Sequence, residues 1–383
     1  MMAAVKTAIF LAALAASASL CLGPTLLPAA PASAQDSSPL SRWQSREYGG
    51  VRYVGGVVCA RCHKAESETQ TATPMAHALE PASDCGVLAQ SRRLTFTNGP
   101  YVYSVAGAAG RPVYTVTDGK RSITEPVLYC FGRGEVGQTY VFQHDGRLYE
   151  TRVSYYRGIQ GLDFTVGHPR AAPSSLDDAL GRPLGPDEAR DCFGCHAPEA
   201  VGGNKLRLEG FGPGVTCESC HGPGEEHVAA AVRKDLRDPR IFNPGELNGL
   251  ELSQEFCGSC HVGFDKAMLM PGQGGPNNIR FQAYRIFNSP GHRGGDPRIS
   301  CVACHDPHRD VERAPAFYDS KCLACHVSDA KEAKTKERAA AACPVAKTEC
   351  VKCHMPKVEI PETHARFTDH WIRTVRPGDA VPH

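Results

Sequence analysis

The chain has 383 residues, with 42 Lys and Arg against 41 Asp and Glu, so its formal net charge is +1. This balance gives no bias toward nucleic acid or strongly acidic partners, and the length allows two or three domains. Cysteine is abundant for a chain of this length, at 18 residues, and its spacing carries most of the information.

Residues 1–34 have the features of a secretory signal. Lys6 precedes an apolar run over 8–22, and the small residues of 32–34 form a cleavage site before Gln35. The apolar run is short for a bilayer span, and no later stretch is longer and as apolar. We therefore predict cleavage, a mature protein that does not span a membrane, and a periplasmic or secreted location.

Seven segments read Cys-x-x-Cys-His. Two thiols and an imidazole on one helical turn suit two thioether bonds to haem vinyl groups and one His–iron bond. Zinc sites also use Cys-x-x-Cys, but they do not require His directly after the second Cys. All seven pairs have it, although only 16 residues are His. We predict seven covalently attached haem c groups. Motifs 1 to 7 are Cys59, Cys62, His63; Cys192, Cys195, His196; Cys217, Cys220, His221; Cys257, Cys260, His261; Cys301, Cys304, His305; Cys322, Cys325, His326; and Cys350, Cys353, His354.

Residues 35–89 form the predicted N-terminal segment with motif 1. A polar, helical stretch follows the motif and ends near Met75 and His77, which are both candidate iron ligands. A thioether would raise the iron's reduction potential, whereas a second imidazole would keep it low. The sequence leaves the choice between the two residues open.

Residues 90–168 contain no motif and alternate apolar with polar residues, as in the segments 94–97, 101–105, 113–117, 139–143 and 148–153. Asn98-Gly99, Asp118-Gly119 and Asp145-Gly146 are turn signals between them. We predict a small antiparallel β domain inserted between motifs 1 and 2. Cys85 and Cys130 flank and enter it, and they could form a disulfide in an oxidising compartment.

Residues 169–383 carry the other six motifs and many Gly and Pro residues. Short helical signals occur at 187–191, 225–236 and 331–342. The predicted fold class is therefore α with much irregular structure around stacked c-type haems, plus the inserted β domain.

Nine histidines lie outside the motifs. His227 and His308 follow their nearest motifs too closely to bend back to the same iron, so each is expected to serve another haem. His292, His364 and His370 are predicted iron ligands, and His168 is a further candidate. His144 lies in a predicted turn and His383 at the chain end, and neither is expected to bind iron.

The segments 214–227, 299–308 and 350–370 give the chain a family resemblance. It resembles the multihaem c-type cytochromes of the superfamily that includes hydroxylamine oxidoreductase, its tetrahaem acceptor cytochrome and the pentahaem nitrite reductases. The resemblance covers residues 50–85 and 185–375. It implies closely packed haems in stacked and perpendicular pairs, with His227 and His308 capping haems other than their own.

The chain departs from the catalytic members of that superfamily. It has no Cys-x-x-Cys-Lys, which binds the catalytic haem of the pentahaem nitrite reductases, and no counterpart of the covalently linked Tyr of hydroxylamine oxidoreductase is evident. We therefore predict a heptahaem electron carrier rather than an enzyme with its own substrate. Its expected partners are other redox proteins or quinol-linked membrane donors, with no nucleic acid.

Two alternative functions stay open at the level of the sequence. One is a multihaem oxidoreductase that acts on a small nitrogen or sulfur compound at one open haem. The other is a homo-oligomer, as a subunit of a conducting cytochrome filament.

Overall fold

The computed structural model of the chain describes residues 52–91, 93–108, 111–203, 205–235, 237–270, 275–293, 296, 298–326, 343, 345–376 and 378–382. They belong to one unit, Ser38–His383. The predicted signal sequence, Gln35, the helix predicted over 331–342 and His383 lie outside the described residues.

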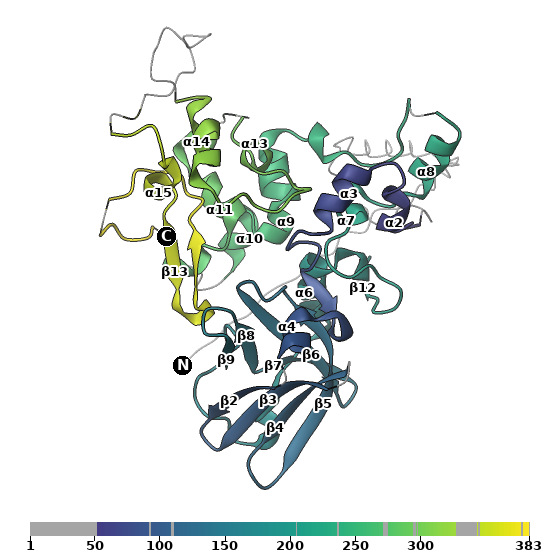
Figure 1. The fold of residues 1–383 in the computed structure, drawn as a ribbon, viewed down its shortest axis with the longest axis vertical. Helices are drawn as coiled ribbons and strands as arrows, with labels where there is room; N and C mark the ends of the chain where they lie inside the picture. The colour runs from purple at the N-terminus through teal and green to yellow at the C-terminus, as the bar shows by residue number, and fades with distance from the viewer. Residues whose placement is uncertain are drawn as a thin grey trace, which may run out of the picture. The chain divides into compact units, whose positions relative to one another are not determined.

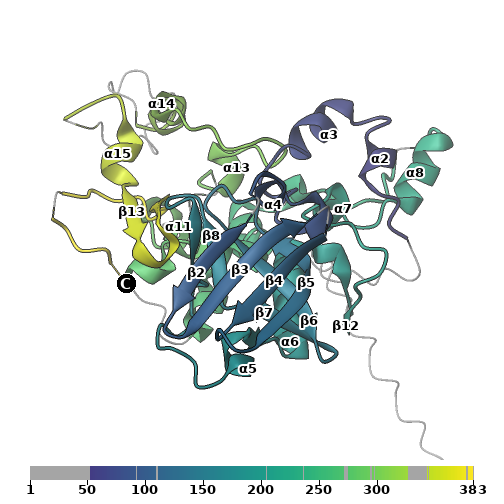
Figure 2. The ribbon, with the colours of Figure 1, turned by 60° about the horizontal axis from the view of Figure 1, so that its bottom comes forward.

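Ten strands within the described residues form one antiparallel sheet, in the order β10-β7-β6-β5-β4-β3-β2, with β1 paired to β5, and β8 to β6 and β9. Figure 2 shows β2, β3, β4 and β5 side by side. The strands are β1 Leu79–Pro81, β2 Leu94–Asn98, β3 Tyr101–Ala108, β4 Arg111–Thr117, β5 Ser122–Phe131, β6 Gly137–His144, β7 Arg147–Thr151, β8 Val153–Tyr156, β9 Gly161–Phe164 and β10 Gly181–Pro183.

The alternating pattern of the sequence explains the central strands. On β4, Tyr114 and Val116 are buried while Thr115 and Thr117 are not, so one face packs inward. The predicted turns are present, and Asp145 and Gly146 both have positive φ, at 47° and 75°. This is the conformation that a two-residue hairpin turn requires, and it fixes the register of β6 against β7.

The sheet is larger than the sequence pattern predicts. β1 pairs with β5 through Leu79 and Phe131, and β10 pairs with β7 through Gly181 and Thr151, although both strands lie outside residues 90–168. The prediction of a mainly helical fold was therefore wrong in its proportions, because a substantial sheet accompanies the short helices. The domain boundaries stay predictions.

Short helices carry the motifs, and Figure 1 shows most of them above the sheet, while the helix of motif 2 lies against it. No helix in the described part of the chain is long and apolar enough to cross a membrane. The helices are α2 Gly56–Cys59, α3 Lys64–Gln70, α4 Gly86–Gln90, α5 Leu176–Ala179, α6 Pro186–His196, α7 Cys217–His221, α8 Glu225–Val232, α9 Gly258–His261, α10 Phe264–Leu269, α11 Gln282–Phe287, α12 Pro290–Arg293, α13 Cys301–Cys304, α14 Pro315–Leu323 and α15 Cys350–His354.

Other short elements connect these helices. They are the 3-10 turns η1 Ala82–Asp84, η2 Pro198–Ala200, η3 Pro244–Glu246, η5 Gly275–Asn278 and η6 Pro361–Thr363, the π-helical turn η4 Glu251–Phe256, and the hairpins β11 Val201–Gly202 with β12 Lys205–Leu206 and β13 Lys357–Ile360 with β14 Ala365–Thr368.

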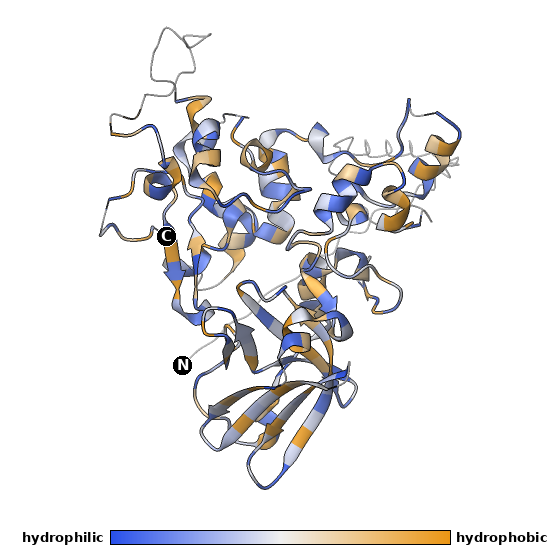
Figure 3. Ribbon diagram, in the orientation of Figure 1, coloured by the Kyte–Doolittle hydropathy of each residue, from blue (hydrophilic) through white to orange (hydrophobic). Residues whose placement is uncertain are grey.

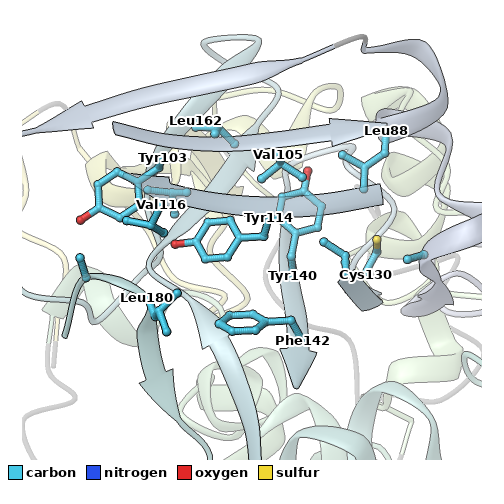
Figure 4. Close-up of a cluster of buried hydrophobic side chains, with 14 of the residues drawn as sticks. Leu88, Tyr103, Val105, Tyr114, Val116, Cys130, Tyr140, Phe142, Leu162 and Leu180 are labelled. Atoms are coloured by element: carbon cyan, nitrogen blue, oxygen red, sulfur yellow. The ribbon is translucent and has the colours of Figure 1, made fainter. Parts of the chain in front are cut away.

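The apolar core of the described residues lies mainly within and against the sheet. Tyr103, Tyr114, Tyr140 and Phe142 are fully buried in one cluster, shown in Figure 4. A second cluster joins the sheet to α6 through Phe193, and Figure 2 shows α6 close to β6. Apolar and polar residues are interspersed along the motif helices in Figure 3, and only small clusters form among them.

A buried ion pair anchors the C-terminal segment to α11. Arg285 and Asp369 are both fully buried, and two hydrogen bonds of 2.8 and 2.7 Å join them. Burial acts to raise the pKa of Asp369, but the hydrogen bonds from Arg285, Trp371 and Arg373 outweigh it and hold that pKa below its usual value. The pair therefore stabilises the fold at neutral pH, and this stabilisation is lost as the pH falls through the lowered pKa.

We expect Arg285→Met to lower the apparent free energy of unfolding by about 3 kcal/mol or more, because it leaves Asp369 buried without its main partner. Urea unfolding measures the change. Arg237→Ala is the matched control, because its pair with Asp235 is exposed and should contribute under about 1 kcal/mol. Equal effects of the two substitutions would contradict the role given to the buried pair.

Candidate functional site

The motif helices begin at residues suited to starting a helix. α6 starts at Pro186, where no intrahelical hydrogen bond is lost, and Asp187 lies in its first turn. α7 starts after Thr216, which exchanges hydrogen bonds with Ser219 in a capping box. These starts place the two thiols and the imidazole of motifs 2 and 3 on the last turns of their helices.

Three motif histidines each face a histidine from a distant part of the chain. The ring centroids are 6.3 Å apart for His63 and His227, 6.1 Å apart for His221 and His308, and 6.2 Å apart for His305 and His370. In each pair one ring belongs to a motif and the other does not.

This spacing matches two imidazoles on opposite sides of one metal ion. A metal–imidazole bond is about 2.0 Å long and the nitrogen lies roughly 1.2 Å from its ring centroid, so two such rings have centroids about 6.4 Å apart. Packed aromatic pairs occupy a wider range, of roughly 4.5–7 Å. The three pairs here all lie between 6.1 and 6.3 Å. The residues present therefore fit an iron held by two imidazoles.

A hydrogen bond to a backbone carbonyl orients one ring of each pair. A carbonyl oxygen can only accept, so a neutral ring that donates through Nδ1 leaves the Nε2 lone pair for a metal. Nδ1 donates to Phe242 O in His221, to Pro239 O in His227, and to Thr368 O in His370, over 3.0, 2.6 and 3.0 Å. Two motif histidines outside the three pairs, His196 and His354, donate in the same way to Ala78 O and Arg373 O, over 2.8 and 3.0 Å.

Burial keeps several of these imidazoles neutral. It lowers the pKa of His370 to about 4, where the nearby His305 acts in the same direction. Burial also lowers the pKa values of His196, His221 and His305. A neutral ring is the form that binds a metal, so the protein environment favours the ligating state at neutral pH.

His292 makes the same kind of Nδ1 hydrogen bond, although no second imidazole faces it within the described residues. Its Nδ1 donates to Ile299 O over 2.9 Å, and its Nε2 is buried with no hydrogen-bond partner within the described residues. A buried imidazole nitrogen without a partner is costly unless something outside the polypeptide binds it. This environment supports the predicted ligand role of His292.

Four other histidines bind carboxylates instead. His77 bonds Glu80 Oε1 over 2.7 Å and Thr71 O over 3.1 Å, so both of its nitrogens are engaged. The other contacts are His144 to Glu125 over 2.7 Å, His168 to Glu150 over 3.1 Å, and His364 to Asp163 over 2.8 Å. Met75 is partly buried. The ligand roles given to Met75, His77, His168 and His364 stay predictions, as do those given to His227, His292, His308 and His370.

Hydrogen bonds tie motif 3 to the residues that precede motif 1. Glu218, inside motif 3, is 2% exposed and accepts amide hydrogens from Val54, Gly55 and Gly224. The thiols of motifs 1 and 3 also meet, since a hydrogen bond from Cys59 lowers the pKa of Cys217 to about 7. Motifs 1 and 3 are therefore direct neighbours.

Similar contacts join other motifs that are adjacent in space. Cys195 lies 3.8 Å from Ser259 O, which joins motifs 2 and 4. Ser253 Oγ accepts the amide hydrogen of Cys301 over 3.3 Å, which joins motifs 4 and 5. Asp319 accepts the amide hydrogens of Glu349 and Cys350 over 2.8 and 2.9 Å, which joins motifs 6 and 7.

Packing supplies the two remaining links. Phe242, whose carbonyl orients His221, packs in one cluster with Phe256 and Cys257, so motif 3 adjoins motif 4. The helix α13 packs against α14, so motif 5 adjoins motif 6. These contacts join motifs 1–3–4–5–6–7 in series. Motif 2 adjoins motif 4 and also motif 3, because Thr216 before motif 3 donates a hydrogen bond to Glu199 after motif 2.

Sequence reasoning missed Glu218, Ser253 and Asp319, which hold neighbouring motifs together. Each is a polar residue near a motif whose partners lie elsewhere in the chain. No local pattern distinguishes them from polar residues exposed to solvent. Glu218 gives a weak signal, because it is an acid inside a motif whose thiols we expect to be buried.

Residues 173–222, which include motifs 2 and 3, match the model of a protein family described as cytochrome c554 and c-prime. This match supports a c-type cytochrome. Among curated proteins, none matches the chain. One solved structure that resembles the chain is the crystal structure of the outer cell wall cytochrome OcwA, with a TM-score of 0.48 and 15% identity over 85% of this chain and 80% of the other.

Proposed function

We propose that the protein is a heptahaem c-type cytochrome that carries electrons between redox partners outside the cytoplasm. The observation that carries the proposal is the set of three imidazole pairs at the spacing of a metal with two axial ligands. In each pair the motif supplies one ring and the two thiols for covalent attachment, while a distant segment supplies the second ring.

The bound group would supply a one-electron couple at each motif, at low potential where both axial ligands are imidazoles. The polypeptide holds the rings, fixes their neutral tautomers and sets the motifs next to one another. We infer that the line 1–3–4–5–6–7 is the main array and that motif 2, beside motifs 3 and 4, is a side branch that lies against the sheet through Phe193.

An exported location follows from the same chemistry. Cytochromes of this type receive their haem outside the cytoplasm, and the sequence begins with an expected secretory signal. The proposed partners are other redox proteins or quinol-linked membrane donors, which would exchange electrons at the ends of the array or at the side branch.

We expect the intact mass of the purified, exported protein to show seven covalent haem additions, because seven complete motifs are present. Cys343→Ala should also carry seven, since Cys343 belongs to no motif. A mass with fewer additions, or bound zinc in place of haem, would overturn the proposal.

We expect His370→Ala to leave one iron without its second axial ligand. One haem of the seven should then become high-spin and bind carbon monoxide, and one midpoint potential should rise, as measured by electron paramagnetic resonance and a spectroscopic redox titration. Added imidazole should restore the low-spin signal.

His144→Ala is the matched control, because His144 bonds Glu125 and is not placed opposite a motif imidazole. It should leave every spin state unchanged. If His370→Ala also leaves all spin states unchanged, the pairing of His305 with His370 is wrong. Carbon monoxide binding by the unmodified protein would instead favour the alternative of an oxidoreductase with an open haem.

A further inference from the structure

Two cysteines that belong to no motif lie together inside the sheet. Cys85 directly precedes α4 and is 1% exposed, while Cys130 lies on β5 and is 0% exposed. Both are members of the same buried cluster, and Figure 4 shows the Cys130 sulfur pointing into that cluster. Their neighbours there are apolar or aromatic side chains, and no motif residue belongs to the cluster.

The two thiols are in direct contact. The Cys130 thiol donates a hydrogen bond to Cys85, and Cys85 Sγ in turn lies 2.8 Å from Gln138 Oε1, which can only accept. The hydrogen bond lowers the pKa of Cys85 and raises that of Cys130. Cys85 is therefore the more readily ionised thiol of the pair.

Backbone pairing holds both cysteines in place. β1 pairs with β5 so that Glu80 lies opposite Cys130, and the turn η1 then returns the chain so that Cys85 meets the Cys130 side chain. The contact is thus defined on one side by a strand register and on the other by a short turn. The backbone therefore fixes the positions of both cysteines, so their contact does not depend on side-chain mobility.

We propose that Cys85 and Cys130 form a disulfide in the exported protein, and that it fastens the segment after motif 1 to the central sheet. A free buried Cys commonly acts only as a small apolar side chain. Two touching thiols outside the cytoplasm have the further option of oxidation. The inference rests on the export that forms part of the proposed function.

The oxidation needs an electron acceptor, which would be the disulfide of a thiol oxidase in the export compartment. The Cys85 thiolate attacks one sulfur of that disulfide and releases the other as a thiolate, which leaves a mixed disulfide. The Cys130 thiolate then attacks the Cys85 sulfur and releases the second oxidase thiolate. Two electrons pass to the oxidase, which becomes a dithiol by taking up the two protons from Cys85 and Cys130.

Burial determines when this exchange takes place. An oxidase cannot reach sulfurs that are 0–1% exposed, so the bond must form before β5 and α4 close over it. For the same reason the finished disulfide should resist reductants while the protein stays folded.

The test is thiol trapping on the exported holoprotein with its haems attached. The protein is denatured in iodoacetamide, with or without prior reduction, and its peptides are identified by mass spectrometry. We expect Cys85 and Cys130 to stay unmodified and linked without reduction, and to be modified after it. Cys343, which is exposed, should be modified in both samples. Modification of both Cys85 and Cys130 without reduction would overturn the proposal.

Variants separate this proposal from the proposed function. Cys130→Ala should expose Cys85 to iodoacetamide in the denatured, unreduced sample. The Cys85→Ala/Cys130→Ala protein should unfold at a temperature roughly 5–10 °C lower, because its unfolded chain is no longer closed into a loop. Its haem count should not change. A normal haem count with free thiols would refute only the disulfide, whereas missing haem with a linked pair would refute only the cytochrome.

Discussion

The hydrogen bonds that backbone carbonyls accept from Nδ1 of the histidines are the constraint on which the candidate sites depend. They bind rings from different parts of the chain, such as His196 and His370, to carbonyls on other segments or nearby turns. A ring that donates in this way must offer Nε2 to whatever lies opposite. The polypeptide thus selects both the nitrogen and its direction without help from a charged partner.

Beside these carbonyl-bound rings, several charged groups hold segments together. Asp369 precedes His370, yet it bonds Arg285, Trp371 and Arg373, while a carbonyl orients the imidazole itself. Glu218 and Asp319 likewise accept backbone amide hydrogens from neighbouring motif segments. With apolar clusters small in this region, such bonds supply much of the order that side-chain packing supplies in the sheet.

The sequence predicts local features well and distant pairings poorly. β4 follows from alternation and the turn at Asp145-Gly146 from residue type, because both depend on near neighbours. β1 and β10 are three residues long and contain Pro, so only their pairing to β5 and β7 makes them strands. His364 contacts Asp163 on β9, and His63 meets His227 on α8, so both contacts join distant parts of the chain. No window of sequence contains both members of these pairs.

The order in which the two imidazoles of each pair occur along the chain has a consequence for biosynthesis. In all three, the ring opposite the motif comes from later in the chain, as His227 does for His63 and His370 for His305. A chain that emerges from its N-terminus presents the thiols and first imidazole of motif 1 long before residue 227 arrives. Under the proposed function, a haem attached at motif 1 before residue 227 arrives would gain its second imidazole only in a later step.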